Sequence, residues 1–325
     1  MHPFAEYIRI LGRGKKGSRN LTQDEAFRAF QMILNNDVEP EQLGAFLMLV
    51  RVKEETPEEL AGFVQAAKSV ISYDQTATID LDWSSYAGKR RQLPWFILSA
   101  LLLASNGIKV LMHGLKGRKD DRVYTPDALA AFGITPCTSL NEAAKQAHTD
   151  GFAFIELQTL IPKLSELIDL RDILGLRSPV HSLSRLLNPL NAPHVLQGIF
   201  HPGYKAIHRD TAALLNLPHA SIIKGDGGEI ELNPDIDNEV FTVNNGTCGH
   251  ETWPAMFRER HLKDQTMDTS RLVKVWRGEF NDEYGEAAVV LTTATALKLL
   301  QKEHDQTSAL TLAQSWWDKR QKDKY

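Results

Sequence analysis

Apolar side chains recur at helical spacing through the first seventy residues of the chain. Thr22 and Glu25 have the spacing of a capping box, and apolar residues follow them three and four positions apart. Thr56 and Glu59 repeat this pattern around a proline, which is favoured at the first position of a helix. A third apolar stretch, residues 42–52, lies between the two. The pattern predicts an all-helical N-terminal unit.

After about residue 74, short apolar and β-branched runs alternate with helical stretches. The segment 163–187, rich in Leu and Arg, is predicted to be helical again. Strands that alternate with helices indicate a mostly parallel sheet wrapped by helices. We expect strands at residues 77–81, 108–112, 152–157 and 220–224, and helices at 93–106, 203–215, 283–303 and 309–319.

These elements predict an α/β protein with two domains. Residues 1–74 form a small all-helical N-terminal domain, joined by helices from about residues 160–190. Residues 75–159 and 191–325 form a larger α/β domain with a mostly parallel central sheet. A length of 325 residues is consistent with two domains of ordinary size.

Composition excludes several classes of protein. A hydrophobic content of 42% with 24% charged residues excludes wholesale disorder. Cys137 and Cys248 stand alone, which argues against a disulfide-stapled secreted scaffold and predicts a cytoplasmic protein. The longest apolar run, residues 95–104, is half of the ~20 residues that span a bilayer, so we expect no membrane partner. The net charge of −4 does not favour nucleic acid, although local basic clusters can override it.

A glycine-rich segment near the N-terminus has the spacing G-x-G-x-x-G. A dinucleotide site needs a hydrophobic strand before these glycines, whereas a helical pattern precedes Gly12, Gly14 and Gly17. We therefore reject a dinucleotide site. The segment is either a solvated loop or a pliable loop that follows a chain of phosphates. Its four cations are Arg13, Lys15, Lys16 and Arg19.

Three blocks of sequence resemble the anthranilate phosphoribosyltransferases. Residues 42–63 read QLGAFLMLVRVKEETPEELAGF, like the opening of that family. Residues 171–192, RDILGLRSPVHSLSRLLNPLNA, are similar to its R-x-x-L-G-x-R-T…L-G-P-L-x-N-P signature. Residues 195–235 are similar to its strand, glycine turn and acidic pair. The resemblance implies a helical domain joined to an α/β domain, and a homodimer that pairs through the helical domain.

The diphosphate motifs of the family have changed in this chain. In the family, the backbone N–H groups of a G-T-G-G-D loop meet the phosphate oxygens. In this chain the matching segment is residues 80–95, DLDWSSYAGKRRQLPW. The family's N-x-S-T falls on PWFI, residues 94–97. Bulky side chains at these places imply that phosphoribosyl transfer is lost.

The remaining pocket motifs are partly kept. The family's K-H-G-N-R becomes Met-His-Gly-Leu-Lys, and the acidic pair that holds Mg²⁺ becomes Ile230-Glu231. We expect no cofactor, and Mg²⁺ only if the protein is an active transferase. The residues that the resemblance identifies as a vestigial substrate pocket are His113, Gly114, Arg171 and Glu231.

Cations stand where the glycines were lost. One cluster replaces the phosphate loop and another follows the predicted strand at 108–112. The resemblance implies that both lie at the mouth of one cleft, where the loop of residues 13–19 could join them. The R-G-K…R-x-L start of the chain is similar to the YbiB-like paralogues of the family, which implies nucleic-acid binding without sequence preference by a homodimer. The expected binding residues are Arg13, Lys15, Lys16, Arg19, Lys89, Arg90, Arg91, Lys116, Arg118 and Lys119.

The main hypothesis is therefore a homodimer that binds DNA or RNA through phosphate contacts and is not an enzyme. The alternative is an active glycosyl- or phosphoribosyltransferase that uses phosphoribosyl diphosphate and an unknown acceptor. A third is a scaffold that uses its dimer surface and basic C-terminal tail. Arg171, Arg177 and Arg185 are either phosphate ligands or internal ion-pair partners. Four aromatic residues could stack on bases, although core packing is favoured: Trp83, Tyr86, Trp95 and Phe96.

The sequence offers no established catalytic motif. The chain has 11 histidines but no H-E-x-x-H and no Cys/His cluster, so no metal site is predicted. Ser182 and Ser184 lie close to His181, yet no G-x-S-x-G nucleophile elbow surrounds them. Hydrolase chemistry is therefore not expected.

Overall fold

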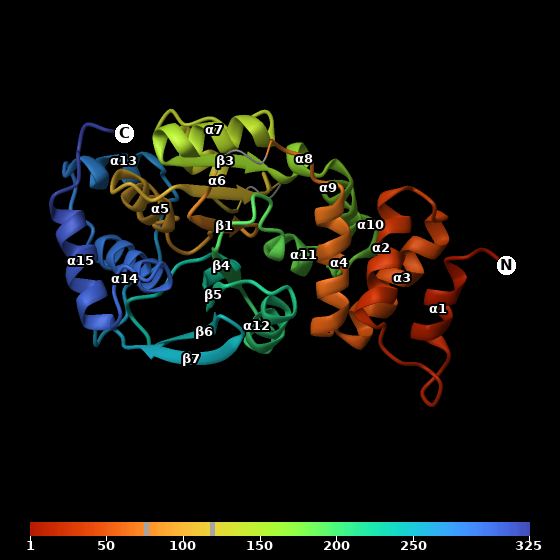
Figure 1. The fold of residues 1–325 in the computed structure, drawn as a ribbon. Helices are drawn as coiled ribbons and strands as arrows, with labels where there is room; N and C mark the ends of the chain where they lie inside the picture. Colours follow the sequence, from red (N-terminus) through yellow and green to blue (C-terminus); the bar gives the residue numbers. More distant parts are fainter. Residues whose placement is uncertain (75–77, 118–120) are drawn as a thin grey trace.

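The computed structural model describes residues 1–74, 78–117 and 121–325. Figure 1 shows a group of helices beside a sheet that is wrapped by further helices. This is the expected fold class, a helical domain with an α/β domain. Within the described ranges no helix is long and apolar enough to cross a membrane.

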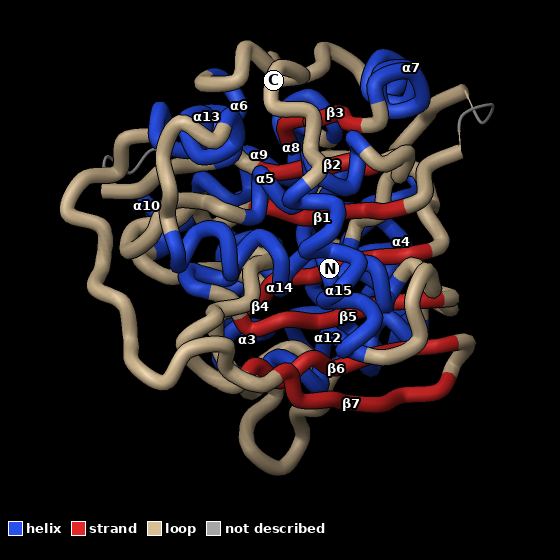
Figure 2. Tube along the Cα trace, turned by 90° about the vertical axis from the view of Figure 1, so that its left-hand side faces the viewer, coloured by secondary structure: helices blue, strands red, loops and turns tan. Residues whose placement is uncertain are grey.

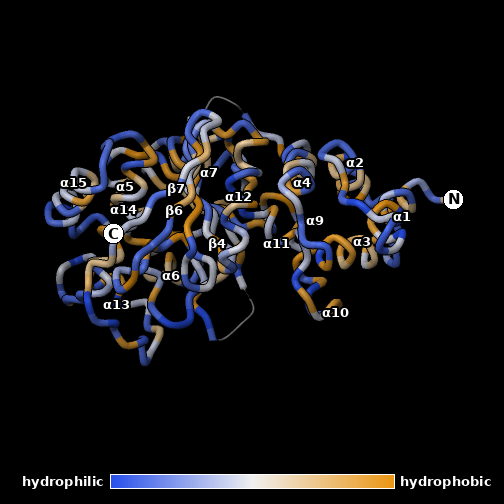
Figure 3. Tube along the Cα trace, turned by 90° about the horizontal axis from the view of Figure 1, so that it is seen from below, coloured by the Kyte–Doolittle hydropathy of each residue, from blue (hydrophilic) through white to orange (hydrophobic). Residues whose placement is uncertain are grey.

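Helices from two parts of the chain share one apolar core. Phe30, Phe46 and Phe63 from the first part pack in the same cluster as Leu164 and Leu183 from the second. Figure 3 shows both sets on one side of the molecule, away from the helices at the C-terminus. The helices are α1 (Ala5–Gly12), α2 (Gln23–Leu34), α3 (Pro40–Lys53) and α4 (Pro57–Ser69), then α8 (Leu157–Leu160), α9 (Pro162–Asp169), α10 (Arg171–Leu174), α11 (Val180–Leu183) and the 3-10 turn η1 (Ser184–Leu186).

The two predicted helix starts are confirmed. The Thr22 hydroxyl accepts a hydrogen bond from the backbone N–H of Glu25 at 3.2 Å, and the Glu25 carboxylate accepts one from the Thr22 N–H. Thr56 and Glu59 make the same reciprocal pair. Each box satisfies N–H groups that have no partner inside the helix, which is why local sequence places these ends well.

A seven-stranded sheet forms the centre of the α/β domain, in the order β3-β2-β1-β4-β5-β6-β7. The first five strands in the chain are parallel, and the last two add as an antiparallel hairpin at one edge, which Figure 2 shows. The mostly parallel sheet is therefore as predicted. The strands are β1 (Leu81–Ser85), β2 (Val110–Gly114), β3 (Phe152–Glu156), β4 (His194–Ile199), β5 (His219–Lys224), β6 (Asn238–Asn244) and β7 (Thr247–Trp253).

The predicted strand at residues 77–81 is wrong in its position. β1 begins at Leu81, and residue 77 lies outside the described residues. Asp82, Ser84 and Ser85 make the segment read as a polar loop, yet all three are buried. Two of them have hydrogen-bond partners in distant parts of the chain: the Ser85 hydroxyl donates to Glu229, and one oxygen of Asp82 lies 3.3 Å from His113 of β2.

Helices cover both faces of the sheet. Successive side chains of a strand point to opposite faces of the sheet, so Leu111 and Met112 in β2 belong to different apolar clusters. Trp83, Trp95 and Phe96 are buried in the larger cluster, so they pack in the core. One face carries α5 (Phe96–Ser105), α6 (Thr125–Ala130), α13 (Ser270–Arg277), α14 (Glu283–Leu299) and α15 (Gln306–Asp318), and the other carries α7 (Leu140–Asp150) and α12 (Tyr204–Leu214).

The order of the strands fixes where a ligand would bind. β1 pairs with β2 on one side and with β4 on the other, so the chain leaves neighbouring strands in opposite directions. Such a switch point leaves a crevice at the carboxyl ends of the strands. The helical domain faces this edge, with α11 nearest to the strands in Figure 1.

Candidate functional site: an arginine-lined cleft

A cavity of about 230 Å³ lies between the helical domain and the carboxyl edge of the sheet. Its wall comes from the segments that follow β1, β2 and β4, from α12, and from α3, α9 and α11. Cations outnumber carboxylates in this wall. They are Arg51, Lys116, Arg122, Arg171, Arg177 and Arg185, against Glu55, Asp169 and Asp172.

A second cavity of about 350 Å³ adjoins the first. It adds Arg90 to the wall, and the exposed ring of Phe200 lines both cavities. We refer to the two cavities together as the arginine cleft. Its shared arginines are Arg51, Arg122, Arg171 and Arg177.

Two arginines of the cleft are held by backbone carbonyls. The Arg185 guanidinium is buried and donates to the carbonyls of Gly198 and Gly228 at 2.8 and 2.6 Å. Arg122 donates to the carbonyl of Ala87 at 2.8 Å. These bonds position the two guanidinium groups, and Glu229 is the anion whose charge acts on Arg185.

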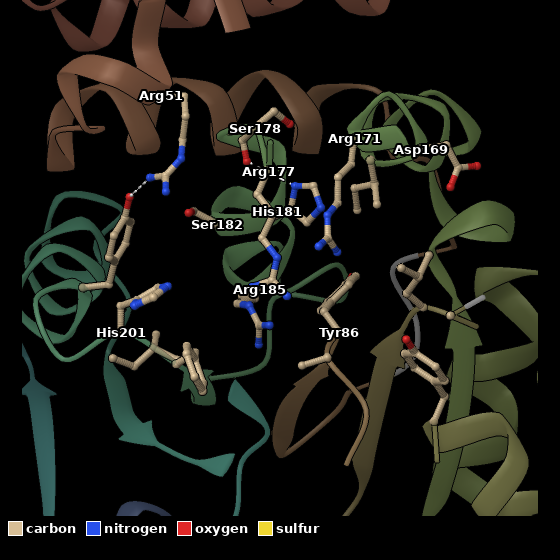
Figure 4. A pocket seen from close by; sticks show the side chains of 18 of the residues that line it. Arg51, Tyr86, Asp169, Arg171, Arg177, Ser178, His181, Ser182, Arg185 and His201 are labelled. Atoms are coloured by element: carbon tan, nitrogen blue, oxygen red, sulfur yellow. Dashed lines mark hydrogen bonds between the residues drawn. The ribbon is translucent and has the colours of Figure 1, made fainter. Parts of the chain in front are cut away.

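Arg171 and Arg177 have no ion pair with any carboxylate of the described residues. Figure 4 shows them beside Arg185 in the cleft. Burial, and then the neighbouring arginines, lower the pKa of Arg177 to about 10. Burial and Arg177 also lower the pKa of His181 to about 3, so this ring is neutral. The interpretation of these arginines as internal ion-pair partners is therefore wrong for the described residues, and the cleft is a site of unbalanced positive charge.

The loop after β1 binds an internal carboxylate. Glu229, which is fully buried, accepts hydrogen bonds from the N–H groups of Ala87 and Gly88 at 2.6 and 2.7 Å and from the Ser85 hydroxyl at 2.7 Å. Gly88 has φ +67°, a conformation that favours glycine. The backbone amides that would meet a ligand phosphate at this loop are thus used inside the protein.

Lys89 does not face the cleft, which corrects its assignment as a nucleic-acid ligand. Its ammonium lies 2.6 Å from a carboxylate oxygen of Glu231, and both side chains are 1% exposed. The other Glu231 oxygen accepts the Phe96 N–H at 2.9 Å. A lysine charge at this depth requires a partner, because desolvation of an unpaired charge is very costly.

Glu231 is likewise wrong as a pocket residue, since it lines neither cavity. Glu229 and Glu231 are both occupied by internal donors, so they do not fit a Mg²⁺ site of the kind that the transferase alternative needs. Throughout the described part of the chain, no group of three His, Cys, Asp or Glu side chains is arranged to hold a metal ion.

His113 and Gly114 serve the interior of the sheet and line neither cavity, so their placement in the pocket is wrong. His113 is buried between the Tyr86 hydroxyl, 2.7 Å from Nδ1, and Asp82, 3.3 Å from Nε2. A Cβ on Gly114 would lie 2.0 Å from the Ser85 carbonyl, so only glycine fits there. Tyr86 is the one predicted stacking residue that lines the cleft.

The N-terminal basic loop does not reach the arginine cleft in this chain. It follows α1 at the end of the helical domain that faces away from the sheet in Figure 1, and none of its residues lines either cavity. Arg19 is paired with Glu25 at 2.6 Å. The expected convergence of three clusters therefore fails for Arg13, Lys15, Lys16 and Arg19.

The other predicted cations divide between the cleft and its surroundings. Lys116 and Arg90 line the cleft, whereas Arg91 lies 4.0 Å from Asp226 and lines neither cavity. Arg118 and Lys119 lie outside the residues that the structure describes.

Sequence reasoning missed Arg51 and Tyr204, which meet across the cleft at 3.1 Å. Arg51 stands within an apolar helix without any local signal, so only the docking of α3 against α12 identifies it. Arg177 and Arg185 lie in the segment 171–192, whose resemblance to the family signature is the sequence signal for this wall of the cleft.

Comparisons with known proteins agree with this fold. Two models of a glycosyl transferase family match, the helical bundle domain over residues 5–69 and the a/b domain over residues 97–319. The chain is 32% identical over 228 residues to an uncharacterized protein of Aquifex aeolicus (strain VF5), covering 69% of each. It is 28% identical over 267 residues to the uncharacterized protein YbiB of Escherichia coli (strain K12), covering 77% of this chain and 82% of YbiB.

A solved structure supports the same conclusion at the level of the fold. The crystal structure of anthranilate phosphoribosyltransferase (TrpD) from Thermus thermophilus superposes with a TM-score of 0.81. The match covers 98% of this chain and 94% of that one, at 20% identity. The resemblance to the YbiB-like paralogues of the anthranilate phosphoribosyltransferases is confirmed.

Proposed function

From the premise that this chain belongs to the glycosyl transferase family with a helical bundle and an a/b domain, we propose that it binds nucleic-acid phosphates in the arginine cleft. Binding is independent of sequence and involves no catalysis. The proposal includes a cytoplasmic homodimer that pairs through the helical domain, with DNA or RNA as its partner. Its phosphate ligands are Arg51, Arg90, Lys116, Arg122, Arg171 and Arg177.

The observation that carries this proposal is the surplus of guanidinium charge in the cleft. Arg171 and Arg177 have no carboxylate partner among the described residues, and burial with mutual repulsion lowers the pKa of Arg177. An arginine presents a rigid fork of donors that matches phosphate oxygens. Phosphate contacts carry no direct sequence information, which accounts for binding without sequence preference.

The loop after β1 also argues for binding rather than transfer. Glu229 occupies the N–H groups of Ala87 and Gly88, and Glu231 is paired with Lys89. A diphosphate with its magnesium ion would have to displace these buried partners. Binding through the arginine side chains leaves them in place.

Titration of a labelled oligonucleotide at several salt concentrations tests the proposal. If six phosphates are neutralised on duplex DNA, log K should fall against log salt with a slope of about −5. Arg171→Ala with Arg177→Ala should weaken binding alike for unrelated sequences and make this slope shallower. Lys15→Ala with Lys16→Ala is the matched control, because these lysines lie outside the cleft. Affinity that does not depend on salt, or that survives loss of both arginines, would overturn the proposal.

The second candidate is an active glycosyl- or phosphoribosyltransferase. Family membership and the position of the cleft, with Arg171 in its wall, favour it. Calorimetric titration with phosphoribosyl diphosphate, with and without Mg²⁺, separates the two functions. Tight, magnesium-dependent binding would support the transferase. The absence of a measurable heat of binding at millimolar phosphoribosyl diphosphate would count against it.

A further inference from the structure

One wall of the arginine cleft contains a buried hydroxyl without a partner. Ser178 is 3% exposed and lines the first cavity, and its Oγ makes no hydrogen bond to any described residue. Ser184, in the following turn, donates to the Val180 carbonyl at 2.7 Å in the ordinary way. A buried hydroxyl that lacks a protein partner costs free energy, so Ser178 indicates a polar ligand beside it.

His181 supplies an acceptor at the same wall. Its Nδ1 lies 3.2 Å from the Ser178 carbonyl, which can only accept, so Nδ1 carries the proton. The ring is neutral, and its Nε2 therefore offers a lone pair. No described residue donates to Nε2, so this nitrogen is a free acceptor in a wall whose arginines can only donate. A ligand with an anionic group and a neighbouring hydroxyl would accept hydrogen bonds from the arginines and donate one to Nε2.

The charge of this wall exceeds that of one phosphodiester. Arg177 and Arg171 stand beside Arg185 without a described carboxylate partner, as Figure 4 shows. A phosphomonoester carries about −1.5 to −2 at pH 7, against about −1 for an internal phosphodiester. A terminal phosphate therefore balances the guanidinium groups better.

A bridge of three side chains borders the cavity on one side, and an aromatic ring lies at the adjoining cavity. Arg51 donates to the Tyr204 hydroxyl at 3.1 Å, and that hydroxyl donates to Glu55 at 2.7 Å. This bridge ties the helical domain to α12 across one side of the cavity. A strand that ends in the cavity leaves this bridge in place. The exposed ring of Phe200 offers a surface for the adjoining base.

We propose that Arg177, Ser178 and His181 form a binding site for the terminal phosphate of a single nucleic-acid strand. The inference rests on the proposed function and deepens it, because it names the part of the nucleic acid that enters the cleft. The Ser178 hydroxyl and the Arg177 guanidinium donate to phosphate oxygens. His181 Nε2 accepts from a hydroxyl of the terminal sugar or of a singly protonated phosphate.

Single-stranded oligonucleotides of one sequence test the site. Three forms are compared, with a 5′-phosphate, with a 3′-phosphate and with hydroxyl groups at both ends, each labelled away from the varied end. One of the phosphorylated forms should bind about tenfold more tightly than the hydroxyl form, since charge-assisted hydrogen bonds are the strong ones. Equal affinity for all three would overturn the site while leaving general nucleic-acid binding intact. No binding of any form would overturn both.

Ser178→Ala is the variant that assigns the preference to this wall. It removes an unpartnered hydroxyl, so the variant should fold and unfold like the parent. It should lose most of the preference for the phosphorylated end, so that its affinities for the phosphorylated and hydroxyl forms lie within about twofold of each other. Ser18→Ala, in the loop after α1, is the matched control and should keep the preference. A preference that survives in Ser178→Ala would contradict the assignment.

Competition identifies the source of the phosphate. Inorganic phosphate and a 5′-mononucleotide are titrated against the phosphorylated strand. A strand end occupies the second cavity, with Phe200 and Arg90, as well as the first. Both competitors should therefore be weaker than the unlabelled phosphorylated oligonucleotide by at least about tenfold. Equal potency of the mononucleotide would show that the site takes a small phosphomonoester, and would overturn the strand-end proposal.

Discussion

Replacement of Lys89 by alanine should destabilise the fold and leave nucleic-acid affinity nearly unchanged. The Lys89 ammonium lies 2.6 Å from Glu231, and both side chains are 1% exposed. Without Lys89, Glu231 keeps a single hydrogen bond, from the Phe96 N–H. The variant therefore leaves a buried carboxylate with no opposite charge beside it.

The expected cost is about 3–5 kcal/mol, the usual result of removing one partner of a buried pair. This is a large part of the ~5–15 kcal/mol that stabilises a folded domain. Burial raises the pKa of Glu231, and Lys89 opposes that rise. In Lys89→Ala the carboxyl is protonated more easily, so the deficit should shrink as the pH falls and grow as the pH rises.

Denaturant and thermal unfolding, followed by circular dichroism, measure the effect, and oligonucleotide titration measures affinity. Arg90→Ala is the matched neighbour, because Arg90 lines the cleft and should lose affinity without loss of stability. Lys89→Met with Glu231→Leu removes both charges and should recover most of the stability. Wild-type unfolding of Lys89→Ala together with weak nucleic-acid binding would refute the buried pair.

Two further substitutions test other parts of the structure. Glu229→Ala frees the N–H groups of Ala87 and Gly88, so millimolar pyrophosphate should raise the unfolding temperature of the variant more than that of the wild type, in which only the arginine cleft is open to it. Equal shifts would contradict the role of Glu229. Burial, and then Arg185, lower the pKa of His208 to about 3. As the pH drops, His208 is protonated in the unfolded chain before it is protonated in the folded protein. The free energy of unfolding therefore falls between about pH 6.5 and pH 3, by at most about 1.4 kcal/mol per pH unit for this group. His208→Gln should flatten that slope in urea unfolding at pH 7, 6 and 5, and an unchanged slope would exclude His208 as its source.

Local signals in the sequence located the helices well. Thr22 and Glu25 fix the start of α2 through hydrogen bonds between residues three apart, so no distant contact is needed. The β6–β7 hairpin was not predicted, although its turn has a local signal in the sequence. Asn245 and Gly246 have φ of 46° and 79°, as a two-residue hairpin turn requires, and an Asn-Gly pair favours such a turn.

Strand β1 shows why the edge of the site was harder to predict. Asp82 and Ser85 are polar and resemble loop residues, yet they lie in a strand buried on both faces. Their hydrogen-bond partners, His113 and Glu229, are 31 and 144 residues away. Alternation of polar and apolar residues carries no information about partners at that distance.

By itself, the sequence determined the fold class, the family and the presence of many cations near the carboxyl edge of the sheet. Only the tertiary structure decided which cations are available to a ligand. Lys89 is paired with Glu231, 142 residues away, whereas Arg177 stands in the cleft with no described carboxylate partner. The difference has a physical reason. Secondary structure and family motifs depend on neighbouring residues, but the burial and charge balance of a side chain depend on segments that meet only when the chain folds.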